Sequence, residues 1–228
     1  MKGKLFILVV LGLSACFLSG CSLFMVKDSA KLENLELEIS YLKGQLEKTT
    51  KEKDSALDEL RTQKTQEVRD LERAKAELER SLMKEIGEYK AKLEMTERGL
   101  VITFLTEIFF DSGKDVIREE GQEALSKVAE VLNANVPNSL VAIEGHTDNE
   151  PIKYSGWKTN WELSSARALS VLHYLIDKAE VAPERLSANG YGEYRPVASN
   201  ETPEGMKKNR RVEIVILPEE IKKVKAEE

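Results

Sequence analysis

The stretch 28–98 contains no proline and only two glycines, which favours a single long helix. Its apolar residues recur at first in steps of three and four, which is a heptad pattern. The pattern weakens at Thr49 and Lys53, shifts phase after Leu57, and then continues to Leu93. The first part of this seam is Leu32, Leu35, Ile39, Leu42 and Leu46, and the second includes Leu71, Ala74, Leu78, Leu82 and Ile86.

A helix with so narrow an apolar stripe needs a partner helix to cover it. A parallel second copy of the same chain is the simplest partner, and a solvated single helix that frays in its polar middle is the alternative. At about 1.5 Å per residue, residues 28–98 would extend roughly 105 Å. We therefore expect a coiled-coil spacer that makes the protein a homo-oligomer, with Gly99 ending the helix.

A basic start and a short apolar run open the chain. Lys2 and Lys4 precede the run 5–18, whose 14 residues are too few to span a bilayer. A spanning helix takes about 20 residues, whereas a run of this length suits the hydrophobic part of a secretory signal. An uncleaved membrane anchor is the alternative interpretation.

The four residues 18–21, Leu-Ser-Gly-Cys, resemble the lipobox of bacterial lipoproteins. That resemblance implies that residues 1–20 are a signal peptide, that Cys21 is the acylated mature N-terminus, and that residues 21–27 form a lipidated linker. Three acyl chains, palmitate among them, would exceed the roughly two signals that stable anchoring requires. Ser22 stands where a sorting aspartate would favour the inner membrane, so we expect the periplasmic face of the outer membrane.

Charge and cysteine content exclude several other classes of protein. The net charge of −6 argues against nucleic-acid binding. Cys16 and Cys21 are the only cysteines, which excludes a disulfide scaffold and a cysteine-based zinc site in the body of the chain. His146 and His173 have no third ligand at a suitable spacing, so neither a metal nor another cofactor is expected.

Residues 99–217 have the pattern of a separate domain. Thr159 and Glu162 form a capping box at the start of its second helix. The order βαβαββ predicts an α+β fold in which helices cover one face of a mixed sheet, and residues 218–228 are expected to be a charged tail. Strands are predicted at 100–110, 140–144, 186–190 and 211–217, and helices at 119–132 and 159–178. The second helix should bury Ala168, Leu169, Leu172, Leu175 and Ile176.

Four short motifs follow one another in this domain. They are Gly145-His146-Thr147-Asp148, Leu163-Ser164-Ser165-Ala166-Arg167-Ala168, Gly190-Tyr191-Gly192-Glu193 and Asn209-Arg210-Arg211-Val212-Glu213. In this order they resemble the OmpA-like domain, which outer-membrane proteins, Pal-type lipoproteins and MotB-type motor proteins share. The resemblance covers about residues 100–217 and implies peptidoglycan binding. The loop between Asp148 and Leu163 is longer than in most members, and it looks like that of the MotB branch.

The stem peptides of Gram-negative peptidoglycan carry meso-diaminopimelate, whose free end holds an ammonium and a carboxylate on one carbon. Asp148 and Arg167 offer the matching anion and cation, since a guanidinium binds a carboxylate in a bidentate way. Asn160 begins the helix, where free N–H groups attract a carboxylate. The family resemblance adds Thr147 and Arg210 to the site. A purely structural ion pair between Asp148 and Arg167 is the alternative.

Trp157 and Trp161 in the long loop allow two interpretations, a platform for a sugar or a hydrophobic cover for the loop. The sequence as a whole predicts a structural protein that tethers the outer membrane to the cell wall. An accessory subunit of a MotB-type motor or secretion complex is the alternative, although a motor subunit proper would need a spanning helix with an ionisable group. No cysteine, metal set or serine-centred motif indicates a wall hydrolase, so we expect no enzyme.

Overall fold

The computed structural model describes the backbone of residues 3–88, 90–153 and 155–218, and the side chains within these ranges from residue 31 onward. The chain divides into two units, residues 1–61 and residues 62–228. The predicted signal peptide, linker and lipidated Cys21 lie where no side chains are described, and the predicted tail lies outside the described residues apart from Pro218.

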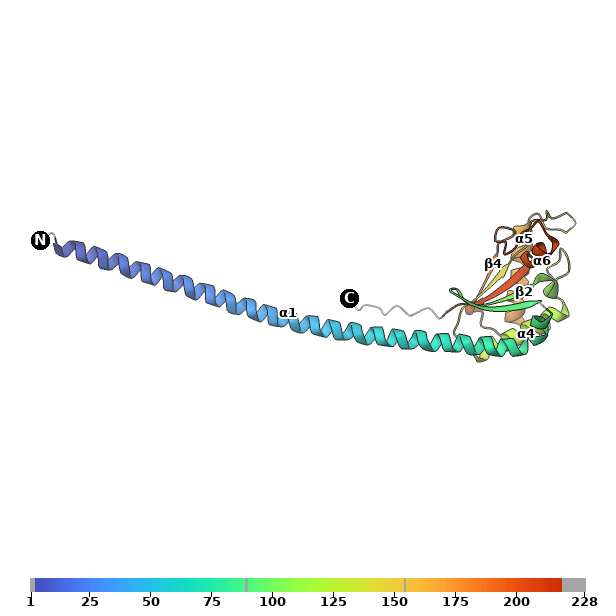
Figure 1. The fold of residues 1–228 in the computed structure, drawn as a ribbon, viewed down its shortest axis with the longest axis horizontal. Coiled ribbons are helices and arrows are strands. Elements are labelled where there is room, and N and C mark those ends of the chain that lie inside the picture. Colours follow the sequence, from blue (N-terminus) through green and yellow to red (C-terminus); the bar gives the residue numbers. More distant parts are fainter. Residues whose placement is uncertain (1–2, 89, 154, 219–228) are drawn as a thin grey trace. The chain divides into compact units, whose positions relative to one another are not determined.

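Helix α1 (Gly3–Ser81) is the one element described in the first unit, and its residues 62–81 belong to the second unit (Figure 1). The five residues of the first heptad seam are between 46% and 68% exposed in the single chain, so this stripe is open to a partner helix. Among the residues described with their side chains, 31–88, 90–153 and 155–218, no helix is long and apolar enough to cross a membrane.

The last turns of α1 belong to the core of the second unit rather than to a spacer. Leu71, Ala74 and Leu78 of α1, and Leu82 directly after it, are at most 3% exposed and pack into the main cluster of buried apolar residues. After Ser81 the chain makes a short helix α2 (Met83–Gly87), which an ion pair between Glu85 and Lys127 fixes to the domain at 3.0 Å.

The predicted single helix through residue 98 is wrong, because α1 ends at Ser81, α2 ends at Gly87, and residues 91–96 form strand β1 (Ala91–Thr96). The apolar residues Ala91, Leu93 and Met95 alternate with polar ones, which is the period of a strand. Leu93 also continues the heptad steps, which concealed the change of period.

Five strands form a mixed sheet in the order β1-β2-β5-β3-β4. Strands β1, β2 (Gly99–Leu105), β5 (Arg211–Ile216) and β3 (Val141–Gly145) pair antiparallel in that order, and β4 (Leu186–Gly190) lies parallel to β3. The predicted α+β class with a mixed sheet is confirmed.

Two details at strand β2 differ from the sequence prediction. Gly99 begins β2 instead of ending a helix. Its φ is +117°, and a Cβ at this position would clash with the Ile216 oxygen at 2.1 Å. The strand also stops at Leu105, and the predicted end of it is the short helix α3 (Thr106–Phe109). Away from β2, the sequence also did not indicate helix α6 (Pro203–Asn209), which precedes β5.

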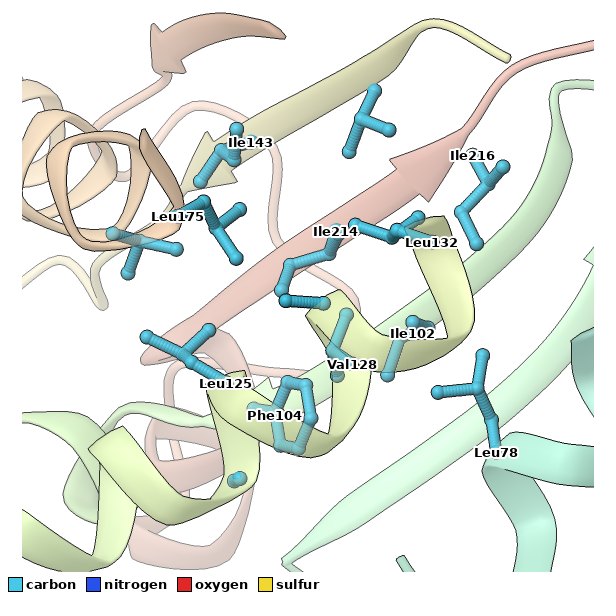
Figure 2. Packing of buried hydrophobic residues seen from close by; sticks show 14 of the residues in the cluster. Leu78, Ile102, Phe104, Leu125, Val128, Leu132, Ile143, Leu175, Ile214 and Ile216 are labelled. Atoms are coloured by element: carbon cyan, nitrogen blue, oxygen red, sulfur yellow. The ribbon is translucent and has the colours of Figure 1, made fainter. Parts of the chain in front are cut away.

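Helices α4 (Glu119–Ala134) and α5 (Asn160–Asp177) pack on the same face of the sheet as the end of α1. Figure 2 shows Leu125, Val128 and Leu132 of α4 and Leu175 of α5 directed toward Ile102, Ile143 and Ile214 of three strands. The inward stripe of α5 follows Ala168, Val171 and Leu175, so Leu169 falls outside it and is 46% exposed, contrary to the prediction. A 3₁₀ turn (Pro183–Arg185) leads into β4.

The end of α1 should contribute to the stability of the domain. Leu78→Ala removes a fully buried side chain and should lower the free energy of unfolding by about 2–5 kcal/mol. Met83→Ala, at a position 68% exposed and outside the heptad seam, should leave it nearly unchanged. Urea denaturation of the full chain, followed by the fluorescence of Trp157 and Trp161, measures both. Equal midpoints for the two variants would show that α1 is not part of this core.

Candidate functional site

A pocket of about 790 Å³ opens beyond the C-terminal end of β3. Its wall comes from residues of the segment 105–113, from loop residues between 147 and 153 and Ser155, from the start of α5, and from the junction between α6 and β5. The structure brings all five predicted site residues to this wall: Thr147, Asp148, Asn160, Arg167 and Arg210.

Two glycines allow α5 to lie directly on the ends of two strands. A Cβ on Gly145, the last residue of β3, would lie 2.1 Å from the Ser164 oxygen, and one on Gly190, the last residue of β4, would lie 2.5 Å from the Ser165 nitrogen. The helix begins where predicted, because the Thr159 hydroxyl accepts a hydrogen bond from the Glu162 N–H at 3.2 Å. This close packing places the first turns of α5 beside the loop that carries Asp148.

Arg167 is buried in the pocket wall, with 4% of its surface exposed. Its Nε donates to the Lys114 carbonyl at 2.9 Å and its Nη2 to the Asp111 carbonyl at 3.2 Å. The guanidinium carbon lies 5.3 Å from the centre of the Phe110 ring, which is a cation–π distance. Burial lowers the pKa of Arg167 to about 10, while Asp115 acts in the opposite direction.

The partners of Arg167 leave its charge without a paired anion. Both hydrogen-bond acceptors are neutral carbonyls, and within the described part of the chain no carboxylate forms an ion pair with this guanidinium. The alternative of a structural Asp148–Arg167 pair is therefore not what the structure contains. A buried cation without a counter-ion is costly, so the wall of the pocket favours an anionic group.

Asp148 pairs instead with Arg210. The Asp148 carboxylate is 5% exposed, accepts a hydrogen bond from the Glu150 N–H at 3.2 Å, and forms a close ion pair with Arg210. The side chain of Arg210 is 41% exposed, so it lies at the rim. Arg210 thus reaches the pocket, where it compensates the charge of Asp148.

The other two predicted residues hold the loop after β3. The Thr147 hydroxyl donates to the Asp148 carbonyl at 2.8 Å. The amide nitrogen of Asn160 donates to the Glu150 carbonyl at 3.1 Å and to the Glu193 carboxylate at 2.7 Å. Asn160 lines the pocket, but these bonds direct its amide nitrogen to the protein's own acceptors.

Sequence reasoning did not assign the segment 110–114 to the site, although it supplies the ring and both carbonyls around Arg167. The sequence feature that could have indicated it is the turn around Gly113, whose φ of +69° suits glycine. Trp157 anchors the long loop to this segment, because its Nε1 donates to the Gly113 carbonyl at 3.0 Å. Trp157 is therefore part of the loop's internal packing.

A second polar cluster lies on the face of the sheet opposite the helices. The donor atoms of Glu144, His146 and Glu213 lie within 4.8 Å of one another, and they form the one set among the described residues that could hold a metal ion. Arg98 already pairs with Glu144 and Arg211 with Glu213, each at 2.6 Å. Because both carboxylates have cationic partners, the arrangement fits an internal ion-pair network better than a metal site.

His146 is the neutral member of this network. Its ring is 2% exposed, stacks on Tyr191 with ring centres 5.3 Å apart, and neither nitrogen has a hydrogen-bond partner among the described residues. Burial, together with the nearby positive charges of Arg211, Arg195 and Arg98, lowers the pKa of His146 from 6.5 to about 3.

Most of the residues that line the pocket lie in a part of the chain that matches a known protein family. The sequence profile of the OmpA family matches residues 109–210. These residues form an OmpA-family domain. All five residues of the candidate site lie inside the match or at its last position.

Two relatives illustrate the range of this similarity. Motility protein B of Bacillus subtilis is 43% identical over 155 residues, which are 68% of this chain and 59% of that protein. The peptidoglycan-binding protein ArfA of Mycobacterium tuberculosis is 44% identical over 94 residues, which are 41% of this chain and 27% of that protein. The chain thus spans less than two thirds of the length of either relative.

A solved structure extends the likeness to three dimensions. The cell wall anchor of the type VI secretion system (T6SS) of Pseudomonas aeruginosa superposes with a TM-score of 0.56 at 34% identity. The superposition covers 62% of this chain and 97% of that one.

The buried His146 should make the domain less stable in mild acid. Because the unfolded chain takes up a proton near pH 6.5 and the folded protein only near pH 3, the unfolded state holds more protons between these values. The free energy of unfolding should therefore fall by about 2 kcal/mol between pH 7 and pH 5.

Urea denaturation at several pH values measures this dependence. In His146→Gln the slope between pH 5 and pH 7 should largely disappear, whereas His173→Gln, at an exposed position, should retain it. A slope that is the same in His146→Gln and in the unaltered protein would contradict the assignment.

Proposed function

We propose that the OmpA-family domain binds peptidoglycan non-covalently, through the diaminopimelate end of the stem peptide. The observation that carries the proposal is the buried guanidinium of Arg167, whose only acceptors among the described residues are neutral carbonyls. The names of two similar proteins, a peptidoglycan-binding protein and a cell wall anchor, support the same class of ligand.

The ligand and the pocket carry complementary charges. The stem carboxylate takes the free N–H groups of Arg167, on which the planar guanidinium can form two parallel hydrogen bonds. The ammonium on the same carbon takes the second side of the Asp148 carboxylate, next to Arg210 at the rim. Thr147 and Asn160 act as positioning residues, since they hold the loop on which Asp148 lies.

The same residues support binding without cleavage. Among the described residues the lining of the pocket contains no histidine and no cysteine. Of its two central cations, Arg210 pairs with Asp148, and Arg167 would bind the carboxylate of the ligand. We infer a structural protein rather than an enzyme, so incubation with purified sacculi should release no soluble fragments.

The N-terminal part of the chain sets where this binding takes place. We propose that acylated Cys21 anchors the protein in the periplasmic leaflet of the outer membrane, and that the domain thereby tethers this membrane to the wall. The exposed stripe of Leu32, Leu35, Ile39, Leu42 and Leu46 supports a parallel homo-oligomer, in which a second copy covers apolar side chains that water surrounds in the single chain.

A second candidate function is an accessory role in a motor or secretion complex that uses the same wall-binding domain. The 43% identity to Motility protein B and the likeness to the T6SS wall anchor favour it. The two candidates share the pocket and differ in the protein partners of the helical part, so co-purification with motor or secretion components separates them.

Replacing the central cation should abolish most of the affinity for a soluble stem tripeptide. Arg167→Ala removes a charge-assisted hydrogen bond worth about 1.5–3 kcal/mol, which corresponds to roughly 10- to 150-fold in Kd. Arg167→Lys should lose most of it too, because an ammonium cannot form the bidentate pair. Arg185→Lys is the matched control, since Arg185 is also buried and bonded to backbone carbonyls, but lies outside the pocket.

Amidation of the ligand tests the contact from the other side. Converting the diaminopimelate carboxylate to an amide should weaken the unaltered protein far more than Arg167→Ala, in which the partner is already missing. Titration calorimetry measures both. Equal losses in the two proteins would mean that Arg167 does not touch this carboxylate.

Cys21→Ser should leave an uncleaved precursor without acyl chains in the membrane fraction, because acylation requires the thiol. Cys16→Ser is the control and should be processed normally, since position 16 leaves with the predicted signal peptide. Mass spectrometry of the N-terminus checks both. Mature protein with an unmodified Cys21 would contradict the lipoprotein assignment.

A further inference from the structure

Two aromatic rings stand out on the surface of the domain. Trp161, in the first turn of α5, and Tyr194, in the loop after β4, stack with ring centres 5.1 Å apart and planes 22° from parallel. Trp161 is 46% and Tyr194 64% exposed, whereas the other described Phe, Tyr and Trp rings of the second unit are buried or half-buried. Large exposed aromatic pairs commonly mark contact sites.

This pair adjoins the pocket. Asn160, which precedes Trp161, lines the pocket and donates a hydrogen bond of 2.7 Å to Glu193, which precedes Tyr194. One hydrogen bond therefore connects the base of the aromatic pair to the pocket wall.

The pair is also held rigidly. Gly192, with φ of +54°, brings the loop so close that a Cβ on it would lie 3.3 Å from the Trp161 nitrogen, and its own N–H donates to the Ser164 hydroxyl at 2.9 Å. Because the loop is bonded to α5 before any ligand arrives, the rings need little further ordering on binding.

We propose that Trp161 and Tyr194 form a platform on which a sugar ring of the glycan strand stacks while the pocket holds the stem peptide. A sugar ring presents an apolar face of C–H groups and a rim of hydroxyls, which suits aromatic rings whose edges stay in water. A stem of three residues extends about 10 Å, so a domain that holds its end keeps the attached sugars nearby. The inference rests on the proposed binding of the stem peptide.

The test compares two soluble probes on the full-length chain, the stem tripeptide alone and the same tripeptide attached to its disaccharide. The unaltered protein should bind the disaccharide form roughly three- to tenfold more tightly, the size of one aromatic stacking contact. Trp161→Ala and Tyr194→Ala should bind both probes with the affinity that the unaltered protein has for the tripeptide alone.

Two further variants make the result specific. Trp161→Phe, which keeps an aromatic face, should retain part of the preference for the disaccharide form. Val197→Ala, which shortens another exposed apolar side chain in the same loop, should retain all of it.

The possible failures are distinguishable. If neither probe binds, the proposed function fails as well. If the unaltered protein binds both probes equally, or if Trp161→Ala weakens both to the same degree, the sugar platform is wrong. Tripeptide binding then survives as a finding, and the proposed function is unaffected.

Discussion

The positive charge of Arg167 inside the domain is the constraint around which the site is arranged. Burial removes water from the guanidinium, and the two carbonyls that replace it compensate only part of the loss. The guanidinium is nevertheless surrounded by protein: the Phe110 ring and the segment 110–114 lie against it, and the first turns of α5 carry it. A ligand carboxylate would complete the arrangement, which is why we regard an anion as the natural occupant of the pocket.

The backbone makes this placement possible. Without side chains on Gly145 and Gly190, α5 can rest on the ends of β3 and β4 instead of standing away from them. That contact fixes the distance between Arg167 on the helix and Asp148 on the loop after the strand. The pairing of Asp148 with Arg210 then leaves the buried guanidinium of Arg167 without an ion-pair partner among the described residues. The two charges that a stem-peptide end requires are therefore separated by the fold, and neither neutralises the other.

Much of the fold could be predicted because it depends on local pattern. The strands β3, β4 and β5, the helices α4 and α5, and the cap at Thr159 follow from period and capping residues in the sequence. The errors arose where two patterns coincide or where distant contacts decide. Leu93 satisfied a heptad and a strand at once, and only pairing with β2 makes it a strand residue. Leu169 is apolar but lies outside the stripe that α5 turns toward the sheet.

The members of the site were predictable from motifs, but their pairing was not. Nothing in the spacing of Asp148, Arg167 and Arg210 indicates which arginine the aspartate selects, because α6 and the junction to β5 bring Arg210 in from the other side. The backbone carbonyls that hold Arg167 are equally invisible to side-chain reasoning, since any residue can supply a carbonyl.

The most direct measurement is co-sedimentation of the full-length protein with purified sacculi in the presence of free meso-diaminopimelate. Our account predicts that the protein sediments with the wall, and that diaminopimelate releases it with a concentration dependence that cadaverine does not reproduce. Cadaverine is diaminopimelate without its two carboxylates, so it keeps both ammonium groups but offers nothing to the Arg167 guanidinium. Sedimentation that diaminopimelate leaves unchanged at saturating concentration would contradict the central claim that this pocket holds the stem peptide.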